Sequence, residues 1–546
     1  MNLRHALIAL VLLAAGIPAS AQQAPPSPER PPTRADILRG EYGRYRANND
    51  LLHYYLDIRV DPERKTVSGK NTIRFRMQSD DRRIQLELHP ALTVDRILLG
   101  ARALNFERVQ RTVYVDFPEI LRAGRTYAIE FHYSGTPQEQ ARFGCLAFRA
   151  DPAGRPWITT ACEDEGSSTW WPGKDQWRDE PDEGARISVA VPNGLMNVSN
   201  GRFLGKTDLG DDYTRWDWEV TYPINSYNIA LNIGAYVQFS ERHRDIPLDY
   251  FVLPENVDAA KAQFAQTRPM LEIFERYFGE YPFARDGFKL IEVPYAGMEH
   301  QSAIAYGNRF KNGYLERDFT GVGISLLFDF IIIHEAAHEW FGNAVSAADV
   351  ADMWIHEGFA TYLEVLYVEG RFGREAAVKY VNGEKPKVRN AAPVVTQRGI
   401  HRSPDQDMYF KGALFLHTLR SVVNDDERWE KALRDFYQQF KYRNILTEDV
   451  VEFFNTALGR NLTPLFNQYL RRAALPTLEL AFTEPGWLAY RWKADERDFA
   501  MPVRVSIKGT SQILEPTTEW TMMPVIASKE EIEVATDLYY INVAIQ

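Results

Sequence analysis

Two histidines four residues apart, His334 and His338, offer the clearest chemistry in this sequence, within the stretch IIIHEAAHEW. Residues at this spacing lie on one face of a helix, so both imidazoles could bind one metal ion. Zinc binds histidine nitrogens and keeps one of its four positions open in a catalytic site. Glu335 lies about 100° around the helix, where it could take a proton from a metal-activated water. The alternative is two histidines and an acid at the edge of a buried helix.

A third ligand is expected from the next predicted helix. Glu357, in IHEGFATYLE, follows His338 by nineteen positions and could pack back against the first helix. The alternative is an acid in a first helical turn, favoured there by the helix dipole. Glu364 lies seven residues further on the same face and could orient a zinc-binding histidine, or it could face outward. We expect one Zn²⁺ per chain.

These residues need a helical frame, and amphipathic or apolar patterns predict one from about residue 246 to residue 475. The run GISLLFDFIIIHEAAHEWFGNAV, residues 323–345, is long and apolar and predicts a single buried helix. AAKAQFAQTRPMLEIFERYFG, residues 259–279, predicts one amphipathic helix. Further helices are expected in residues 351–373, 411–423, 447–459 and 463–474.

Period-two alternation flanks the helical region on both sides. It runs from about residue 45 to residue 241 and returns beyond Pro476, which predicts β-structure in both places. The fold class is therefore multidomain α+β. We expect an N-terminal all-β domain at residues 41–242, a mostly helical catalytic domain at residues 243–475 and a small C-terminal β-domain at residues 476–546.

The N-terminus has the pattern of a secretory signal. A short basic start with Arg4 precedes an apolar run of residues 6–17 and the small residues Ala19-Ser20-Ala21. We expect a signal peptide at residues 1–21 and a proline-rich linker at residues 22–40, with a membrane anchor as the alternative for the apolar run. No other run approaches transmembrane length, so export to the periplasm or the extracellular space is expected.

The composition of the chain argues against a nucleic-acid partner. The chain has 546 residues, a formal net charge of −11 and a pI near 5.6. An acidic chain without a lysine- or arginine-rich tract is a poor nucleic-acid binder, so no nucleic-acid partner is expected.

The chain has two cysteines, Cys145 and Cys162, with the turn signal Asp151-Pro152-Ala153-Gly154 midway between them. A hairpin closed at that turn would place Cys145 opposite Cys162, and an exported chain could form the disulfide. Two free buried thiols are the alternative.

Four motifs together resemble the M1 family of zinc aminopeptidases, which includes leukotriene A4 hydrolase. They are HEAAHEW, the glutamate of HEGF after eighteen intervening residues, PYAGMEH at residues 294–300 and MYFKGA at residues 408–413. The third is similar to the family's G-x-M-E-N signature and the fourth to its tyrosine motif. The resemblance implies an N-terminal β-domain, a thermolysin-like catalytic domain and a small β-domain.

The resemblance also implies roles for individual residues. Glu335 would be the general base, and Tyr409 would stabilise the oxyanion as a hydrogen-bond donor. Glu299, with Gly297 and Met298 of the same motif, would bind the free N-terminal ammonium of a peptide substrate. A second anchor is expected from TTACEDEG, where Glu163 is preferred and Asp164 and Glu165 are rivals. A substrate cation would relieve the repulsion between two such carboxylates.

Two positions depart from the family pattern. His300 follows Glu299 where the family has asparagine, and His356 precedes Glu357 where the usual motif is N-E-G-F. Both add a titratable group near the site, or they act as neutral hydrogen-bonding replacements.

The leading hypothesis is a zinc metallo-aminopeptidase of the EC 3.4.11 class that removes N-terminal residues from peptides. The alternatives are a thermolysin-like endopeptidase, a lipid-epoxide hydrolase and a secreted non-catalytic zinc-binding protein. The endopeptidase would cleave N-blocked substrates, whereas the binding protein would be expected to lose Glu335, Glu357 or Tyr409.

Overall fold

The structure is a computed structural model that describes residues 31–138, 145–484 and 486–546. The predicted signal peptide, residues 1–21, lies outside the described residues, as do residues 22–30 of the predicted linker. In the described part of the chain, no helix combines the length and the apolar character needed to cross a bilayer.

The end of the predicted linker is helical, which differs from the prediction. Helix α1 (Arg34–Gly40) begins in a capping box: Thr33 Oγ1 accepts from the Asp36 amide at 3.2 Å, and the Asp36 carboxylate accepts from the Thr33 amide at 2.7 Å. This reciprocal pair satisfies two amides that a helix start otherwise leaves unpaired. Helix α2 (Arg44–Ala47) follows directly.

The N-terminal region is β-rich, as predicted, and its longest strand alternates buried and half-buried residues. That strand pairs antiparallel with β2 and parallel with β11 in the eight-stranded sheet β13-β14-β11-β1-β2-β8-β4-β5. Its strands are β1 (Asn49–Asp61), β2 (Thr66–Met77), β4 (Leu92–Leu99), β5 (Arg102–Ala103), β8 (Thr126–Gly135), β11 (Ala185–Pro192), β13 (Arg202–Asp208) and β14 (Tyr213–Val220).

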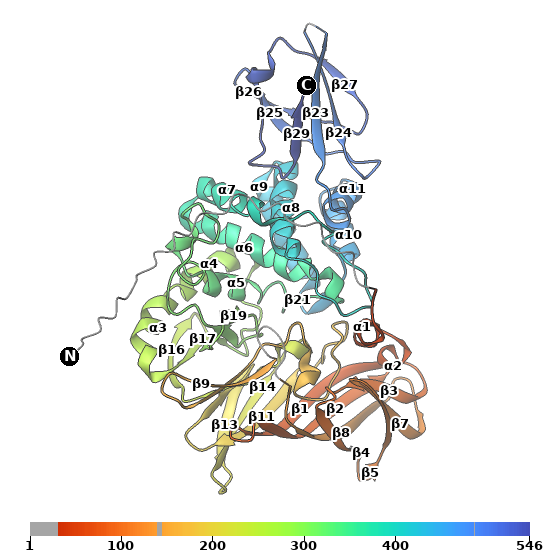
Figure 1. The fold of residues 1–546 in the computed structure, drawn as a ribbon, viewed down its shortest axis with the longest axis vertical. Helices are drawn as coiled ribbons and strands as arrows, with labels where there is room; N and C mark the ends of the chain where they lie inside the picture. Colours follow the sequence, from red (N-terminus) through yellow and green to blue (C-terminus); the bar gives the residue numbers. More distant parts are fainter. Residues whose placement is uncertain (1–30, 139–144, 485) are drawn as a thin grey trace, which may run out of the picture. The chain divides into compact units, whose positions relative to one another are not determined.

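Two smaller sheets complete this region (Figure 1, red to yellow). The sheet β3-β7-β6 consists of β3 (Asp81–Glu87), β6 (Asn105–Val109) and β7 (Thr112–Leu121). The sheet β12-β15-β10-β9 consists of β9 (Leu146–Ala150), β10 (Pro156–Thr160), β12 (Met196–Val198) and β15 (Asn232–Gly234).

The predicted boundary between residues 242 and 243 falls inside a hairpin. Strands β16 (Val237–His243) and β17 (Ile246–Val252) pair with each other, and β17 pairs in parallel with β18 (Phe288–Glu292). With β19 (Gly297–Met298) and β20 (Ile304–Tyr306) they form the sheet β16-β17-β18-β20-β19 of the next region. Apolar and polar residues alternate in this hairpin as they do in the preceding strands, so its sequence resembles that of the N-terminal region. Its partner strand β18 is separated from it by helices α3 and α4.

Two predicted helices are shorter in the structure. The helix predicted at residues 259–279 is split into α3 (Val257–Phe264) and α4 (Thr267–Phe278). In the run at residues 323–345 the α-helix is α5 (Phe330–Ala337), preceded by a short 3-10 turn at Ser325–Leu327. Asp329 sets the start of α5 by accepting from the Ile331 and Ile332 amides.

The remaining helices follow the predicted helical pattern (Figure 1, green to blue). They are α6 (Trp354–Phe372), α7 (Arg374–Asn382), α8 (Asp407–Val423), α9 (Asp426–Phe440), α10 (Thr447–Ala457) and α11 (Thr463–Phe466). A two-stranded sheet joins β21 (Val345–Ala347) to β22 (Arg443–Ile445).

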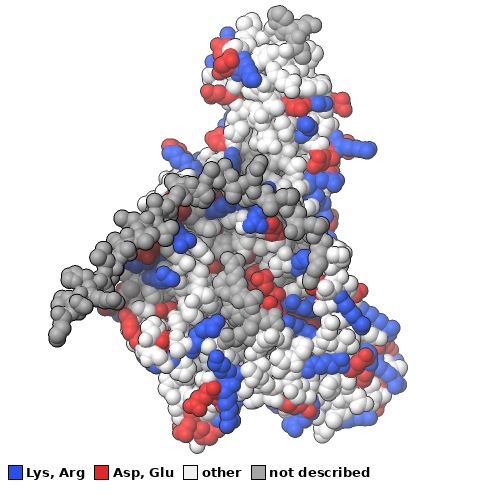
Figure 2. Space-filling model, viewed as in Figure 1, with Lys and Arg blue, Asp and Glu red and all other residues white. Residues whose placement is uncertain are grey.

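The C-terminal region returns to β-structure, which confirms the predicted fold class. The sheet β27-β24-β23-β29 contains β23 (Thr477–Glu484), β24 (Trp487–Lys493), β27 (Thr521–Pro524) and β29 (Asn542–Ile545). The sheet β26-β25-β28 contains β25 (Val503–Ile507), β26 (Thr510–Leu514) and β28 (Ile532–Val534). Acidic and basic side chains are interspersed over the face of the molecule shown in Figure 2.

Candidate active site

Helix α5 presents both predicted histidines to one point. His334 lies in its last turn and His338 is its C-terminal cap, still in helical conformation, and their Nε2 atoms are 3.3 Å apart. Each Nδ1 faces an oxygen: Glu364 Oε1 at 2.7 Å from His334 and the Phe341 carbonyl oxygen at 3.0 Å from His338. With the Nδ1 atoms as donors, both Nε2 lone pairs are left for a metal ion.

Glu357, in the first turn of α6, completes the set. Its Oε2 lies 3.5 Å from His334 Nε2 and 3.3 Å from His338 Nε2. The ligand atoms of these three residues lie within 4.8 Å of one another. Glu357 Oε2 is buried and has no hydrogen-bond partner in the described part of the chain, and an unpaired buried carboxylate oxygen needs a cation. The residues therefore fit a divalent metal ion with the ligand chemistry that zinc prefers.

Glu364 orients His334 within this cluster. It is buried on α6, one oxygen faces His334 Nδ1, and the other accepts from the Tyr380 hydroxyl at 2.5 Å. Of the two alternatives for Glu364, the structure supports orientation of a histidine ligand.

Glu335 projects from α5 toward β19. Burial raises the pKa of its carboxyl to about 7, although the two neighbouring histidines oppose the shift. A Cβ atom on Gly297 would lie 2.6 Å from Glu335 Oε1, so the strand can run this close to the acid only without a side chain there. A buried carboxyl with a pKa near neutrality suits a general base.

Helices α6 and α8 cross at two glycines. A Cβ atom on Gly412 would lie 2.9 Å from the Gly358 Cα, and one on Gly358 would lie 3.1 Å from the Gly412 Cα. The crossing is one residue from Glu357 and three residues from Tyr409, so backbone contact sets where both side chains begin. The Tyr409 ring stacks on the His334 ring at 6.2 Å between centroids.

A cavity of about 420 Å³ contains the cluster. Among the residues lining it are all the predicted metal, catalytic and substrate-binding residues: Glu163, Gly297, Met298, Glu299, His334, Glu335, His338, Glu357 and Tyr409. Glu299 is buried there, and its Oε1 accepts from the Tyr227 hydroxyl at 2.9 Å. Burial raises the pKa of Glu299, although His338 opposes this.

Glu163, rather than its two rivals, faces this cavity. Its Oε1 is buried without a hydrogen-bond partner among the described residues, and burial followed by the repulsion of Glu299 raises its pKa well above the usual range. Asp164 is exposed and accepts from the Ser403 hydroxyl, while Glu165 lies 3.8 Å from the Arg111 guanidinium. The cavity lining includes neither rival.

The two histidines that depart from the family pattern are buried. Burial lowers the pKa of both His300 and His356 to about 3, so both are neutral near pH 7. His356 Nε2 accepts from the Ala347 amide at 2.7 Å, and its ring stacks on Trp177. Neither lines the cavity. The structure supports the interpretation as a neutral hydrogen-bonding replacement for His356, whereas both ring nitrogens of His300 are buried without a hydrogen-bond partner among the described residues.

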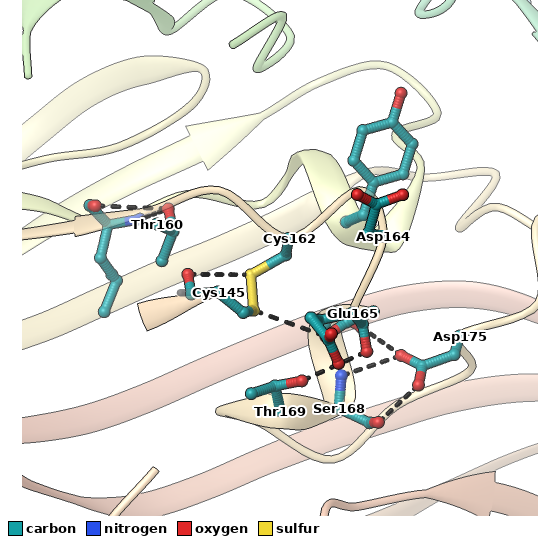
Figure 3. The surroundings of a disulfide bond; sticks show 12 residues. Cys145, Thr160, Cys162, Asp164, Glu165, Ser168, Thr169 and Asp175 are labelled. Atoms are coloured by element: carbon teal, nitrogen blue, oxygen red, sulfur yellow. Dashed lines mark hydrogen bonds between the residues drawn. A yellow bond between two sulfur atoms is a disulfide. The ribbon is translucent and has the colours of Figure 1, made fainter. Parts of the chain in front are cut away.

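Cys145 and Cys162 are joined by a disulfide (Figure 3). The hairpin turns where predicted, but Leu146 pairs with Thr160, which puts Ala161 rather than Cys162 opposite Cys145. The expected cross-strand register is therefore wrong by one residue. The disulfide instead joins residues offset by one position, immediately before Glu163.

Sequence reasoning missed several residues of the site. Tyr227 and Tyr380, which support Glu299 and Glu364, lie outside every motif. Four aromatic residues also line the cavity: Tyr314, Phe319, Phe330 and Phe410. Phe410 lies inside the MYFKGA motif but was given no role, and for the other three the only available signal was the aromatic richness of the chain, which cannot select among 27 tyrosines and 30 phenylalanines.

Family models match both large regions of the chain. The Peptidase M1 N-terminal domain matches residues 51–228 and the Peptidase family M1 domain matches residues 262–469. Probable aminopeptidase 1 of Sulfurisphaera tokodaii is 22% identical over 421 residues, which cover 74% of this chain and 51% of that protein. Aminopeptidase B of Rattus norvegicus is 25% identical over 460 residues, which cover 74% of this chain and 65% of that protein. The chain thus spans less than two thirds of either relative.

A solved structure has the same fold. A mutant M1 zinc metallopeptidase from Deinococcus radiodurans, bound to a Tyr-Ser-Ala substrate, superposes with a TM-score of 0.66 at 21% identity. The match covers 79% of this chain and 96% of that one. With both family domains matched in order, the His-His-Glu cluster within the second and this shared fold, the chain belongs to peptidase family M1.

Proposed function

We propose that the protein is a zinc-dependent aminopeptidase that hydrolyses the N-terminal residue from peptides. The observation that carries this proposal is the placement of two carboxyl groups, the half-buried Glu163 and the buried Glu299, in the same cavity as the His-His-Glu cluster. Each disfavours the ionised form of the other until a cation binds between them. The free ammonium of a peptide is such a cation, and an acylated N-terminus is not.

One zinc ion per chain would be held by His334, His338 and Glu357. When bound, zinc supplies a water of lowered pKa and polarises the scissile carbonyl. The names of the M1 zinc metallopeptidase neighbours and the donor set both support zinc over a harder cation.

The protein's own residues would carry out proton transfer, stabilise the oxyanion and hold the ammonium-binding carboxylate in place. Glu335 accepts a proton from the attacking water at its carboxylate and returns it to the leaving amine. The Tyr409 hydroxyl, whose pKa burial raises well above its usual range, stays protonated and donates a hydrogen bond to the developing oxyanion. Tyr227 holds the Glu299 carboxylate in place through its 2.9 Å hydrogen bond.

Export remains part of this proposal. The signal-like residues 1–21 support it, and the disulfide between Cys145 and Cys162 is compatible with an oxidising compartment. Fractionation of cells that express the full chain tests this, because a protein found only in the cytosol with residues 1–21 retained would contradict export.

The test of the function compares aminoacyl-anilides that have free amines with their N-acetylated counterparts, with and without a chelator. Chelator-sensitive cleavage of only the free-amine set is expected. Equal cleavage of the blocked set would instead identify an endopeptidase. No cleavage of either set by zinc-loaded protein would favour a non-catalytic zinc-binding protein.

A further inference from the structure

The segment that carries Glu163 is held at many points. We call residues 162–169 the anchor segment. Cys162 is joined to Cys145, and the amide and the hydroxyl of Ser168 donate to the Asp175 carboxylate at 2.8 Å and 2.5 Å (Figure 3). The Glu163 carboxylate, in contrast, has an oxygen without a hydrogen-bond partner among the described residues. The backbone is fixed while this acid is left open to the cavity.

Asp164, the next residue, receives hydrogen bonds from two distant parts of the chain. Its carbonyl oxygen accepts from His401 Nε2 at 2.7 Å and from Arg39 at 3.2 Å. Its carboxylate accepts from the Ser403 hydroxyl at 2.5 Å. Arg39 belongs to α1, whereas His401 and Ser403 belong to residues 400–403, the loop that leads to α8 and Tyr409.

Residues 33–43, which we call the N-terminal strap, lie directly on that loop. The His401 amide donates to the Asp36 carbonyl oxygen at 2.9 Å. A Cβ atom on Gly40 would lie 2.3 Å from the carbonyl carbon of Ile400, so the strap reaches this position only with glycine there. Gly43 differs, because the nearest atom to its Cβ would be in the Glu41 side chain, at 3.6 Å.

The far end of the strap is secured by the buried Arg46. This residue donates to the carbonyl oxygens of Leu38 and Glu41 and pairs with the buried Glu87 carboxylate at 2.7 Å. A buried guanidinium with this many acceptors fixes the backbone that it spans. The strap is therefore a built part of the structure and not a loose extension of the linker.

We propose that the N-terminal strap and the 400–403 loop position Glu163 for binding the substrate ammonium, acting through Asp164. This inference rests on the proposed aminopeptidase function. Because the same loop leads to Tyr409, docking of the strap ties the ammonium-binding end of the cavity to the residue proposed to stabilise the oxyanion. Arg39, Gly40 and Ser403 are positioning residues, and none of them lines the cavity.

The experiment uses the full mature chain with zinc bound and compares Gly40→Ala with Gly43→Ala, its matched control in the same strap. Gly40→Ala is expected to raise the KM of a free-amine aminoacyl-anilide about tenfold with little change in kcat, because a displaced anchor weakens ammonium binding. Gly43→Ala is expected to leave both parameters unchanged. Ser403→Ala provides a second, milder variant at an exposed position if Gly40→Ala fails to fold, and Ser403→Thr should restore the wild-type KM.

A double-mutant cycle separates positioning from general stability. In a Glu163→Ala background, Gly40→Ala and Ser403→Ala should have no further effect on KM, since the group that they position is gone. Effects that add in full to that of Glu163→Ala would overturn the proposal. So would equal effects of Gly40→Ala and Gly43→Ala.

Hydrogen exchange of residues 162–169 gives a readout independent of activity. Faster exchange in Gly40→Ala than in Gly43→Ala is expected, and unchanged exchange would refute the contact's positioning role. If the wild-type protein cleaves no free-amine substrate, the proposed function fails, whereas the exchange result still decides whether the strap holds the anchor segment.

Discussion

Replacement of Glu364 by glutamine should weaken zinc binding while leaving the fold intact. The Glu364 carboxylate now faces two donors, His334 Nδ1–H at 2.7 Å and the Tyr380 hydroxyl at 2.5 Å, and all three side chains are buried. A glutamine is neutral and offers one acceptor oxygen, so a bond that it accepts from His334 Nδ1–H is no longer charge-assisted. The weaker acceptor also holds the tautomer with a free Nε2 less firmly.

The magnitude follows from the kind of bond that is lost. A hydrogen bond to a charged group contributes about 1.5–3 kcal/mol when the site is buried. Each 1.4 kcal/mol corresponds to about a tenfold change in an equilibrium constant. Glu364→Gln should therefore raise the zinc dissociation constant by roughly 10- to 100-fold, in line with other outer ligand-orienting groups.

The assay is a competition for zinc between the protein and a chromophoric chelator at fixed pH. Tyr380→Phe is the matched control, since it removes the second donor to the same carboxylate and keeps the bond to His334. We expect that control to lose no more than about threefold in affinity. Wild-type affinity in a folded Glu364→Gln protein, or an equal loss in Tyr380→Phe, would refute the role assigned to Glu364.

Three further predictions concern catalysis and stability. Tyr409→Phe should lower kcat on free-amine anilides by about 10²- to 10³-fold with KM nearly unchanged, as measured by steady-state kinetics, and an unaltered kcat would remove Tyr409 from the mechanism. Burial raises the pKa of Glu180 from 4.5 to about 7, so the folded state binds more protons between these values and the free energy of unfolding falls as pH rises through them. Urea titrations should show the wild type losing about 3 kcal/mol relative to Glu180→Gln between pH 4 and pH 8, and parallel pH profiles would contradict the shift. Replacing both Cys145 and Cys162 by serine should lower the free energy of unfolding by about 3 kcal/mol, and wild-type protein kept in reductant should show the same loss, whereas an equal stability of all samples would contradict the contribution of the disulfide.

The predictable part of the site consists of residues that lie close together in the sequence, because one helix fixes their relative positions. The spacing of His334 and His338 fixes their common face on any helix, even though α5 ends at Ala337, far short of the predicted run. Asp329 begins the helix inside the apolar run, and a buried carboxylate that caps a helix cannot be told from a surface acid by pattern alone.

The contacts between distant segments were not predictable. Tyr227 reaches Glu299 across 72 positions, and Ser403 reaches Asp164 across 239. No periodicity encodes such pairs, because each depends on how separate sheets and helices pack. The predicted boundary at residues 242–243 divides the β16–β17 hairpin for the same reason: alternation identifies a strand but not its partner.

Because α6 and α8 touch at two glycines, the positions of Glu357 and Tyr409 do not depend on the length of the chain between the two helices. Residues 373–406 connect the two helices, yet the spacing between Glu357 and Tyr409 is set by direct backbone contact at Gly358 and Gly412. Insertions or deletions within the connection can therefore be accommodated without altering how the proposed metal ligand and the tyrosine face each other. The same contact makes the helix pair the smallest unit that would have to be reproduced, glycines included, to transplant this arrangement into another scaffold.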